Sequence, residues 1–384
     1  MLSSPWRNVV TEAETLISVF GKTKLAAALK KALRRPSVKV ELSNSGASLR
    51  SLVVAYLAEK PCRALLVAED SDEAHRLCWD LQSLLPSRKV FRFPGPELLD
   101  DVVLPLQKMV VCQRLRCLDA LLENNAVIVT TPEALLLPCL SPSSLRDGSI
   151  HLQQGDYLDR DDFIETLVSR GYRRGAAVVS PGEISARGGI IDVFSPGESQ
   201  PLRIELWGDE LESLRSFDPL TQRSIEERDS FKILPPWEFF LCHRSLSDLQ
   251  ACELDEKQEE LLTLLEQGEI GEGAEALLAL LPWQRASLLD YMQREDLVAW
   301  ALSPLAMDRS REVLDKAFGK HAFQALLTRF EGGPRTLYLC GTQGQGDELQ
   351  SIRTSYRPAE KYGSNISRLS EYIRYWKQER RFLA

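Results

Sequence analysis

The spacing of apolar and polar residues divides the chain into segments of different character. Between about residues 38 and 138, short apolar runs typical of strands alternate with stretches in which apolar residues recur at helical spacing. The strand-like runs are VKVEL, ALLVAED, KVFRFPG and AVIVTT. Strands separated by helices in this way predict a mostly parallel sheet with helical layers.

The helical segments of this region carry signals for where a helix begins. We predict a helix over residues 71–85, with Asp72 and Glu73 in its first turn, where a carboxylate interacts favourably with the helix dipole. A second helix is predicted over about residues 104–124. The sequence TPEALLLP begins a third helix, with proline in the first turn, where no N–H group is needed.

Near residue 150 the pattern changes. DRDDFIETLVSRGYRR predicts one short amphipathic helix that ends at Gly171. It is followed by β-branched runs separated by turn sequences, of which SPGESQP and WGDE predict hairpin connections. No further segment of helical length occurs until past residue 232. The pattern therefore predicts an inserted domain over residues 150–232, with a mainly antiparallel sheet and a packed helix.

Helical spacing returns after ILPPWEFF. It covers about residues 245–266 and 275–330, and a strand is predicted in RTLYLCG and a loop in GTQGQGDE. The last residues, SNISRLSEYIRYWKQERRFLA, predict a helix with one apolar face, which we interpret as the opening of a further domain at which the chain is cut. The predicted organisation is a first domain in two parts, the insertion between them and this closing helix: 1–149, 233–360, 150–232 and 361–384.

Composition and charge restrict the class of protein. Of the 384 residues, 44% are hydrophobic and 27% are charged, which is typical of a soluble globular protein. No apolar run approaches the roughly 20 residues of a membrane helix, and the first residues lack the pattern of a secretory signal. We therefore expect a cytoplasmic protein that does not associate with membranes. The net charge of −8 argues against bulk attraction to polyanions.

The cysteines and histidines do not predict a metal centre. No two of the eight cysteines form a C-x-x-C pair, and the four histidines are scattered. Most of the cysteines lie within apolar stretches, where a free thiol behaves as a small hydrophobic group. We expect reduced thiols in the core, no bound metal and no cofactor.

The stretch ELSNSGAS, residues 41–48, lies between a predicted strand and a predicted helix, where nucleotide-binding α/β domains place their phosphate loop. The motif G-x-x-x-x-G-K-[ST] can be aligned with it, with Gly46 and Ser48 in register. Glu41 replaces the first glycine and Ala47 replaces the lysine that spans the β- and γ-phosphates. No strand ends in an acidic cluster suited to Mg²⁺. The sequence predicts a degenerate site without ATP hydrolysis.

The most specific stretch is GEISARGGIIDVFSPGESQPLRIELWGDELESLRSFDPLTQRSI, residues 182–225. It resembles the second domain of the nucleotide-excision-repair helicase UvrB and, more closely, the equivalent domain of the bacterial transcription-repair coupling factor (Mfd) family. GYRR before it and ILPPWEFF after it agree with this resemblance, which runs from about residue 20 to residue 330. The features in register are Arg187-Gly188, Ile191-Asp192-Val193-Phe194, Arg203, Glu205, Asp209-Glu210 and SLRSFDPLTQRS.

The resemblance implies a fold and a set of partners. The fold is a P-loop-like, UvrB-like α/β parallel-sheet domain with a degenerate nucleotide site, interrupted by an inserted, mainly antiparallel α+β domain. UvrB carries a complete ATP-binding motif in its first domain, whereas the corresponding domain of the coupling factors resembles a UvrB relic that has lost it, which Glu41 and Ala47 match. The second domain implies binding to UvrA, masked by other domains of the full-length factor. RNA polymerase and DNA would be bound by domains absent from this chain.

The resemblance also directs attention to exposed arginines of the inserted domain, since arginine pairs with carboxylates in bidentate fashion and is common at interface hot spots. Arg187 is the first candidate, held on a bend by the glycines after it; the alternative is a pair within the domain, for example with Glu205. Arg173 and Arg203 follow, and each is otherwise a solvated strand charge. Asp192 would support the arginines. Phe194 would be an anchor or, more in keeping with its β-branched neighbours, a core residue.

Three other functions stay open from the residues. In the first, the chain is a divergent UvrB-like P-loop ATPase or helicase that binds DNA. In the second, its basic segment 22–39, with Lys30 and Lys31, binds DNA directly. In the third, it mainly restrains motor domains that this chain lacks. Nucleotide binding that depends on Ser48 would favour the first, and DNA affinity that falls steeply with salt would favour the second.

Overall fold

The computed structural model of the chain describes most of the first 339 residues and one later strand. The predicted loop GTQGQGDE and the predicted closing helix over 361–384 lie outside the described residues. The described ranges are 15–34, 39–43, 45–99, 102–103, 106–239, 242–266, 277–278, 280–330, 333–339 and 349–353.

The first domain is built on a seven-stranded sheet in which every pair of neighbouring strands is parallel. Three neighbouring interior strands are buried along their whole length, as expected for a parallel sheet covered on both faces. In spatial order the strands are β19 (Leu349–Arg353), β1 (Lys39–Ser43), β18 (Arg335–Tyr338), β17 (Leu297–Ala301), β2 (Ala64–Ala68), β6 (Ala126–Thr130) and β3 (Lys89–Arg92).

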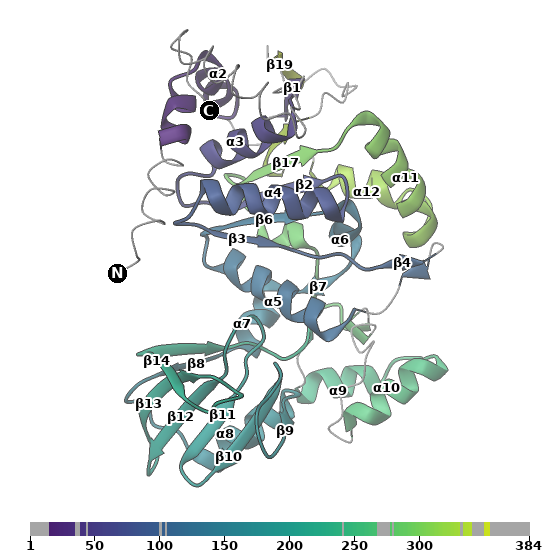
Figure 1. Ribbon diagram of the computed structural model, residues 1–384. Coiled ribbons are helices and arrows are strands. Elements are labelled where there is room, and N and C mark those ends of the chain that lie inside the picture. Colours follow the sequence, from purple (N-terminus) through teal and green to yellow (C-terminus); the bar gives the residue numbers. More distant parts are fainter. Residues whose placement is uncertain are drawn as a thin grey trace, which may run out of the picture.

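Helices cover both faces of this sheet (Figure 1). One apolar cluster joins one face of the sheet to α2 (Lys24–Ala32), α3 (Ala47–Leu57) and α4 (Ser71–Leu84), together with a helical segment over residues 15–21. A second cluster joins the other face to further helices. These are α5 (Lys108–Leu122), α6 (Pro132–Leu136), α7 (Pro142–Gly148), α9 (His243–Gln250), α10 (Glu256–Glu266), η2 (Leu288–Tyr291), α11 (Pro304–Phe318) and α12 (Ala322–Thr328).

The start signals read from the sequence lie at the observed helix ends in two cases. The Asp70 side chain accepts a hydrogen bond from the Glu73 N–H and caps α4, and Pro132 begins α6. The helix predicted over 104–124 begins later, at Lys108. Gln107 has the extended backbone of an N-cap, with φ −70° and ψ 149°, and the preceding described residue is not helical.

The prediction of continuous helical spacing over residues 275–330 was wrong. This segment contains β17, which lies between β18 and β2 in the middle of the sheet. Because LVAWA is buried on both faces, it lacks the alternation that identifies a half-buried strand, and its length alone does not separate it from a helix. The strand predicted in RTLYLCG is confirmed as β18, whereas β19 was not predicted.

The inserted domain is a six-stranded sheet packed on one helix, α8 (Arg160–Ser169). All its neighbouring strands are antiparallel except β9 and β10, which confirms the predicted fold class of a mainly antiparallel inserted domain. The helix ends before Gly171, as predicted, and this glycine has φ +98°. The strands, in spatial order, are β14 (Ser224–Glu227), β13 (Glu210–Phe217), β12 (Leu202–Trp207), β11 (Ile190–Val193), β10 (Glu183–Arg187) and β9 (Arg173–Arg174).

Three short strand pairs complete the described structure. One of them, β8 with β15, lies where the chain enters and leaves the insertion (Figure 1). The pairs are β8 (Ile150–Gln153) with β15 (Ser230–Ile233), β7 (Cys139–Leu140) with β16 (Arg285–Ala286), and β4 (Leu98–Leu99) with β5 (Val102–Val103).

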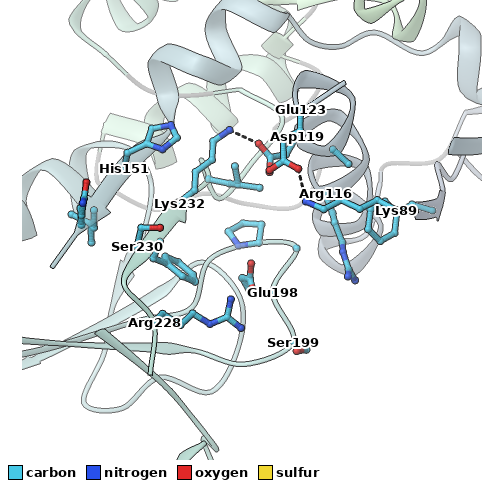
Figure 2. A pocket seen from close by; sticks show the side chains of 18 of the residues that line it. Lys89, Arg116, Asp119, Glu123, His151, Glu198, Ser199, Arg228, Ser230 and Lys232 are labelled. Carbon is cyan, nitrogen blue, oxygen red and sulfur yellow. Dashed lines mark hydrogen bonds and ion pairs between the residues drawn. The ribbon is translucent and has the colours of Figure 1, made fainter. Parts of the chain in front are cut away.

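Side chains of both domains meet around a cavity of about 570 Å³. Figure 2 shows Lys232 of β15 pointing toward Asp119 of α5, with which it forms an ion pair. The hydroxyl of Tyr172 also joins the domains, donating to the Leu234 carbonyl at 2.6 Å. The cavity lining holds as many lysines and arginines as aspartates and glutamates, so its charge does not single out an anionic or a cationic ligand.

Candidate functional site

The degenerate phosphate loop has the predicted placement, with β1 leading in and α3 leading out. Glu41 is buried within β1, and Ser48 is exposed in the first turn of α3, which Ala47 begins. Gly46 is the N-cap of α3 in an extended conformation, with φ −78° and ψ 167°. Phosphate-binding loops turn successive N–H groups inward by alternating right- and left-handed residues, and no described residue between 39 and 50 has a positive φ.

An internal ion pair lies beside this loop. Nη1 of Arg50 is 2.7 Å from Oε1 of Glu73, and the two side chains are only 15% and 10% exposed. Nε of Arg50 also donates to the carbonyl of Ser45 in the loop, at 3.3 Å. Burial raises the pKa of the Glu73 carboxyl above its usual range, an effect that the N–H of Glu69 and the Arg50 guanidinium oppose. The Arg50 guanidinium, which contacts the loop, is thus already paired with a carboxylate of the chain.

Helix N-termini at the same edge of the sheet are also occupied by the chain's own carboxylates. Asp70 caps α4, and Oε1 of Glu69 accepts a hydrogen bond of 2.7 Å from the N–H of Ser303, the N-cap residue of α11. Helix N-termini are the positions at which α/β proteins bind phosphate. In this chain, the N-termini of α4 and α11 instead interact with the carboxylates of Asp70 and Glu69.

The inserted sheet has two faces of opposite character. Its inner face packs Ile184, Ile191 and Ile204 against α8. Because side chains alternate along a strand, the residues between them lie on the opposite face, which we call the outer face. The outer face carries Arg187, Asp192, Arg203, Glu205 and Arg215.

Arg203 and Asp192 form the best-defined contact of the outer face. They lie directly opposite each other on β12 and β11, and the guanidinium makes two hydrogen bonds with the carboxylate, of 2.7 and 2.8 Å. Arg203 also stacks over the ring of Phe217, 4.3 Å from its centroid. Both charged side chains are mostly buried. Arg203 is thus held by the domain itself, which favours a positioning role over direct contact with a partner.

Arg187 is held far more loosely. Its Nη2 lies 3.6 Å from Oδ2 of Asp192, and its side chain is 63% exposed. The pair with Glu205 that we considered is absent, because Glu205 accepts from Nη2 of Arg215 at 2.9 Å. Gly188, with φ +57°, makes the turn that follows Arg187. Arg187 therefore presents an exposed guanidinium beside an anchored carboxylate.

The two remaining candidates differ in exposure. Arg173 is exposed on β9 and forms an ion pair with Glu183 on β10. Burial raises the pKa of Glu183, but hydrogen bonds from the N–H groups of Val179 and Ser180 and from Arg173 outweigh it and hold the pKa below its ordinary value. Phe194 is buried, so it cannot serve as an exposed anchor without a rearrangement.

The sequence did not identify every residue of the outer face that is placed to contact a partner. Arg215 lies opposite Arg203, and Trp207 follows Glu205 on the same face of β12 with its indole exposed. Because WGDE was interpreted only as a hairpin connection, Trp207 was not considered as an exposed residue of the outer face. The alternation of Arg203, Glu205 and Trp207 at every second residue was the available signal.

Part of the basic segment 22–39 forms α2, with Thr23 as its N-cap, and residues 35–38 of the segment lie outside the described residues. Lys30 and Lys31 are exposed, and Nζ of Lys30 lies 4.5 Å from the centroid of the Tyr56 ring. These two cations project from a helix that buries Ala26, Leu29 and Ala32 in the same apolar cluster as one face of the sheet.

The described part of the chain offers few reactive or metal-binding groups. The seven described cysteines are free, and burial raises the pKa of Cys78 and of Cys112 to about 11. Among the described residues, no group of three or more His, Cys, Asp or Glu side chains is placed to hold a metal ion. None of the described helices combines the length and apolarity required to span a membrane.

The inserted domain matches a known protein family. Residues 150–239 match the family described as the UvrB interaction domain. This range contains α8, the whole six-stranded sheet and therefore every residue of the outer face.

The wider similarity is to transcription-repair coupling factors, which confirms the predicted resemblance. The chain is 33% identical over 202 residues to the transcription-repair-coupling factor of Bacillus subtilis (strain 168), covering 52% of this chain and 17% of that protein. It is 31% identical over 207 residues to that of Staphylococcus haemolyticus (strain JCSC1435), covering 53% and 18%. The matched region thus spans less than a fifth of the length of these curated relatives.

Proposed function

We propose that the chain is the UvrB-like module of a transcription-repair coupling factor and that the outer face of its inserted domain recruits UvrA for transcription-coupled nucleotide excision repair. The family match over residues 150–239 and the similarity to coupling factors support this proposal. The observation that carries it is the outer face, where an exposed Arg187 stands beside a fixed Asp192–Arg203 pair. Such a surface suits a partner that presents carboxylates.

The residues of the outer face take different roles in this proposal. Arg187 contacts the partner first, and Arg173 adds a peripheral charge. Asp192 and Arg203 position Arg187, since both are fixed and mostly buried. Phe194 supports the domain from inside.

The proposal includes the domain organisation and the partners of the complete factor. The first domain would comprise 1–149 and 233–360, interrupted by 150–232, and residues 361–384 would open a third domain. Other domains of the full-length factor would mask the outer face until RNA polymerase is engaged. RNA polymerase and DNA would be bound by those other domains, in the cytoplasm.

A titration of UvrA with the chain tests the proposal. We expect association at micromolar concentrations or below, and Arg187→Ala should weaken it about 30-fold, as expected for an interface hot spot of about 2 kcal/mol. The matched control is Arg244→Ala. Arg244 is 66% exposed and has Asp248 at 3.6 Å, almost the same exposure and ion-pair distance as Arg187, but it lies on α9. No binding of UvrA to folded wild-type chain would reject the proposal.

The same proposal assigns no ATPase activity to this chain. Glu41, Ala47 and the Arg50–Glu73 pair support this, since together they remove the phosphate-binding lysine and place carboxylates near the loop. The β1–loop–α3 placement favours the rival function, a divergent UvrB-like P-loop ATPase that binds DNA. ATP binding in a calorimetric titration that is lost on Ser48→Ala would favour that rival.

A further inference from the structure

Two exposed aromatic side chains lie in one row at the hairpin end of the outer face. Trp207 is opposite Glu210 in the pairing of β12 with β13, and Tyr157 forms a bridge with Glu210 from its other side. The Tyr157 hydroxyl is 3.4 Å from Oε2 of Glu210. Trp207 is 76% exposed and Tyr157 is 77% exposed. We call Tyr157, Glu210 and Trp207 the aromatic row.

The aromatic row lies on the same face of the sheet as the arginines. Along β12, Arg203, Glu205 and Trp207 occupy every second position, so they point to one side, while Ile204 and Leu206 between them point to the core. Residues directly opposite each other in neighbouring strands share a face. Glu210 and Tyr157 therefore lie on this side as well.

The hairpin after Arg187 holds the charged and the aromatic parts of this face together. The carbonyl of Gly189 accepts a hydrogen bond of 2.8 Å from the N–H of Leu206, the residue before Trp207. A Cβ atom at Gly189 would be 2.7 Å from the Leu206 carbonyl oxygen, so only glycine permits this approach. In the next row, Arg187 pairs with Ile190 and Ile190 pairs with Glu205. Arg187 and Trp207 thus belong to one continuous surface, although the pairing of β12 with β13 shifts register between Glu205 and Leu206.

Neither aromatic side chain contributes to the core of the domain. Exposed single apolar residues are common on protein surfaces, but tryptophan, tyrosine and arginine together are the residues enriched at the centres of interfaces. Tryptophan gains most when a partner supplies a pocket that excludes water from the ring, while nearby charges select the partner and its orientation.

We propose that Trp207, flanked by Tyr157, is the apolar anchor with which the outer face binds UvrA. This inference rests on the proposed function and extends it: the surface of UvrA that binds here combines carboxylates facing Arg187 with an apolar pocket that receives the Trp207 indole. Glu210 lies between Tyr157 and Trp207, and its carboxylate, 3.4 Å from the Tyr157 hydroxyl, marks the polar edge of the pocket.

Substitutions of the aromatic row test this inference in the UvrA titration. Trp207→Ala should weaken binding at least 10-fold, Tyr157→Ala about 3-fold, and Trp207→Phe should keep most of the affinity. The matched control is Trp79→Ala. Trp79 is 74% exposed, like Trp207, but lies on α4 in the first domain, and its loss should leave binding unchanged. The thermal unfolding midpoint of each variant should equal that of the wild type, because both rings are exposed.

The outcomes separate the inference from the function on which it rests. Wild-type binding that is unaffected by Trp207→Ala overturns the aromatic anchor and leaves the recruitment of UvrA in place. Absence of wild-type binding rejects the recruitment itself. If the free chain sediments as a dimer and Trp207→Ala makes it monomeric without changing UvrA affinity, the row is a self-association surface and the inference is overturned. Equal losses for Trp79→Ala and Trp207→Ala overturn it as well.

Discussion

The phosphate loop and the outer face both combine arginines with carboxylates, yet the two regions hold them in opposite ways. Beside the loop, Arg50 and Glu73 are paired at 2.7 Å with side chains 15% and 10% exposed. On the outer face, Arg187 lies 3.6 Å from its carboxylate and is 63% exposed. The same residue types thus form a buried, short ion pair beside the loop and an exposed, longer one on the outer face. Exposure and pairing distance, more than residue type, therefore distinguish the region beside the loop from the outer face.

The largest difference should be in stability. Glu73→Ala removes a carboxylate that accepts hydrogen bonds from Arg50 and from the Glu69 N–H, so we expect a loss of about 2 kcal/mol in the free energy of unfolding. Arg187→Ala should change it by less than about 0.5 kcal/mol, as is usual for exposed positions. Chemical denaturation of both variants measures this.

A double variant provides the control for that prediction. Replacing Arg50 and Glu73 together by leucine should cost less than the sum of the two single replacements, since neither charge is then left without its partner. Additive losses, or equal stabilities of Glu73→Ala and Arg187→Ala, would show that the loop is no more closed than the outer face.

The pH dependence of stability should differ in sign between the two regions. The pKa of Glu73 is raised in the folded chain, so between its unfolded and folded pKa values the folded state binds more protons, and its contribution to stability falls as pH rises. The pKa of Glu183 is lowered, so its contribution is present above the unfolded pKa and is lost as pH falls through the folded one.

Two glutamine variants separate these contributions. Compared with Glu73→Gln, the wild type should gain relative stability as the solution is acidified below neutral pH. Compared with Glu183→Gln, it should lose relative stability in the acidic range. The measurement is the unfolding free energy of the wild type and of both variants along one pH series. If the difference from the wild type changed with pH in the same direction for both variants, the directions of the two pKa shifts would be contradicted.

Much of the fold followed from apolar spacing, whereas the pairing of charges did not. The alternation of strands and helices predicted β1, β2, β3 and β6, because each is a short apolar run between helices. It missed β17, which is as fully buried as β2 and β6 but lies among segments with helical spacing, where a short apolar run cannot be told from a buried helix by periodicity alone. The contact of Arg50 with Glu73 joins α3 to α4, and that of Arg203 with Asp192 joins β12 to β11. Such pairs depend on sheet order and register, which local spacing does not encode.

The residues of the candidate site could also be predicted from the sequence only in part. The resemblance of the inserted domain directed attention to its arginines, but only the register shows that Arg203 is fixed and that Arg187 is exposed. Phe194 was open between core and anchor, and its burial favours the core. Trp207 escaped attention because a short turn sequence carries no information on which face its neighbours occupy.

A smaller effect is expected at Arg173. Its guanidinium is exposed and peripheral, so Arg173→Ala should weaken UvrA binding about 3-fold, in keeping with the modest energies of solvent-exposed ion pairs. Arg174→Ala is the matched control, since Arg174 is exposed on the same short strand and pairs with Ile184, which points to the core. Binding kinetics at two salt concentrations should place the loss in the association rate. Equal effects of the two variants would remove Arg173 from the surface.

The smallest expected effect is at the loop itself. Ala47→Lys restores the lysine of the phosphate-binding motif, yet we expect neither ATP binding by calorimetry nor phosphate release. The added cation would act beside the buried Glu41 and the Arg50–Glu73 pair, and the described loop residues lack the backbone conformation that turns N–H groups toward phosphate. UvrA binding serves as the control for folding and should equal that of the wild type. ATP turnover by this variant would mean that one residue separates the closed region from a working site, and the contrast between the two regions would then be lost.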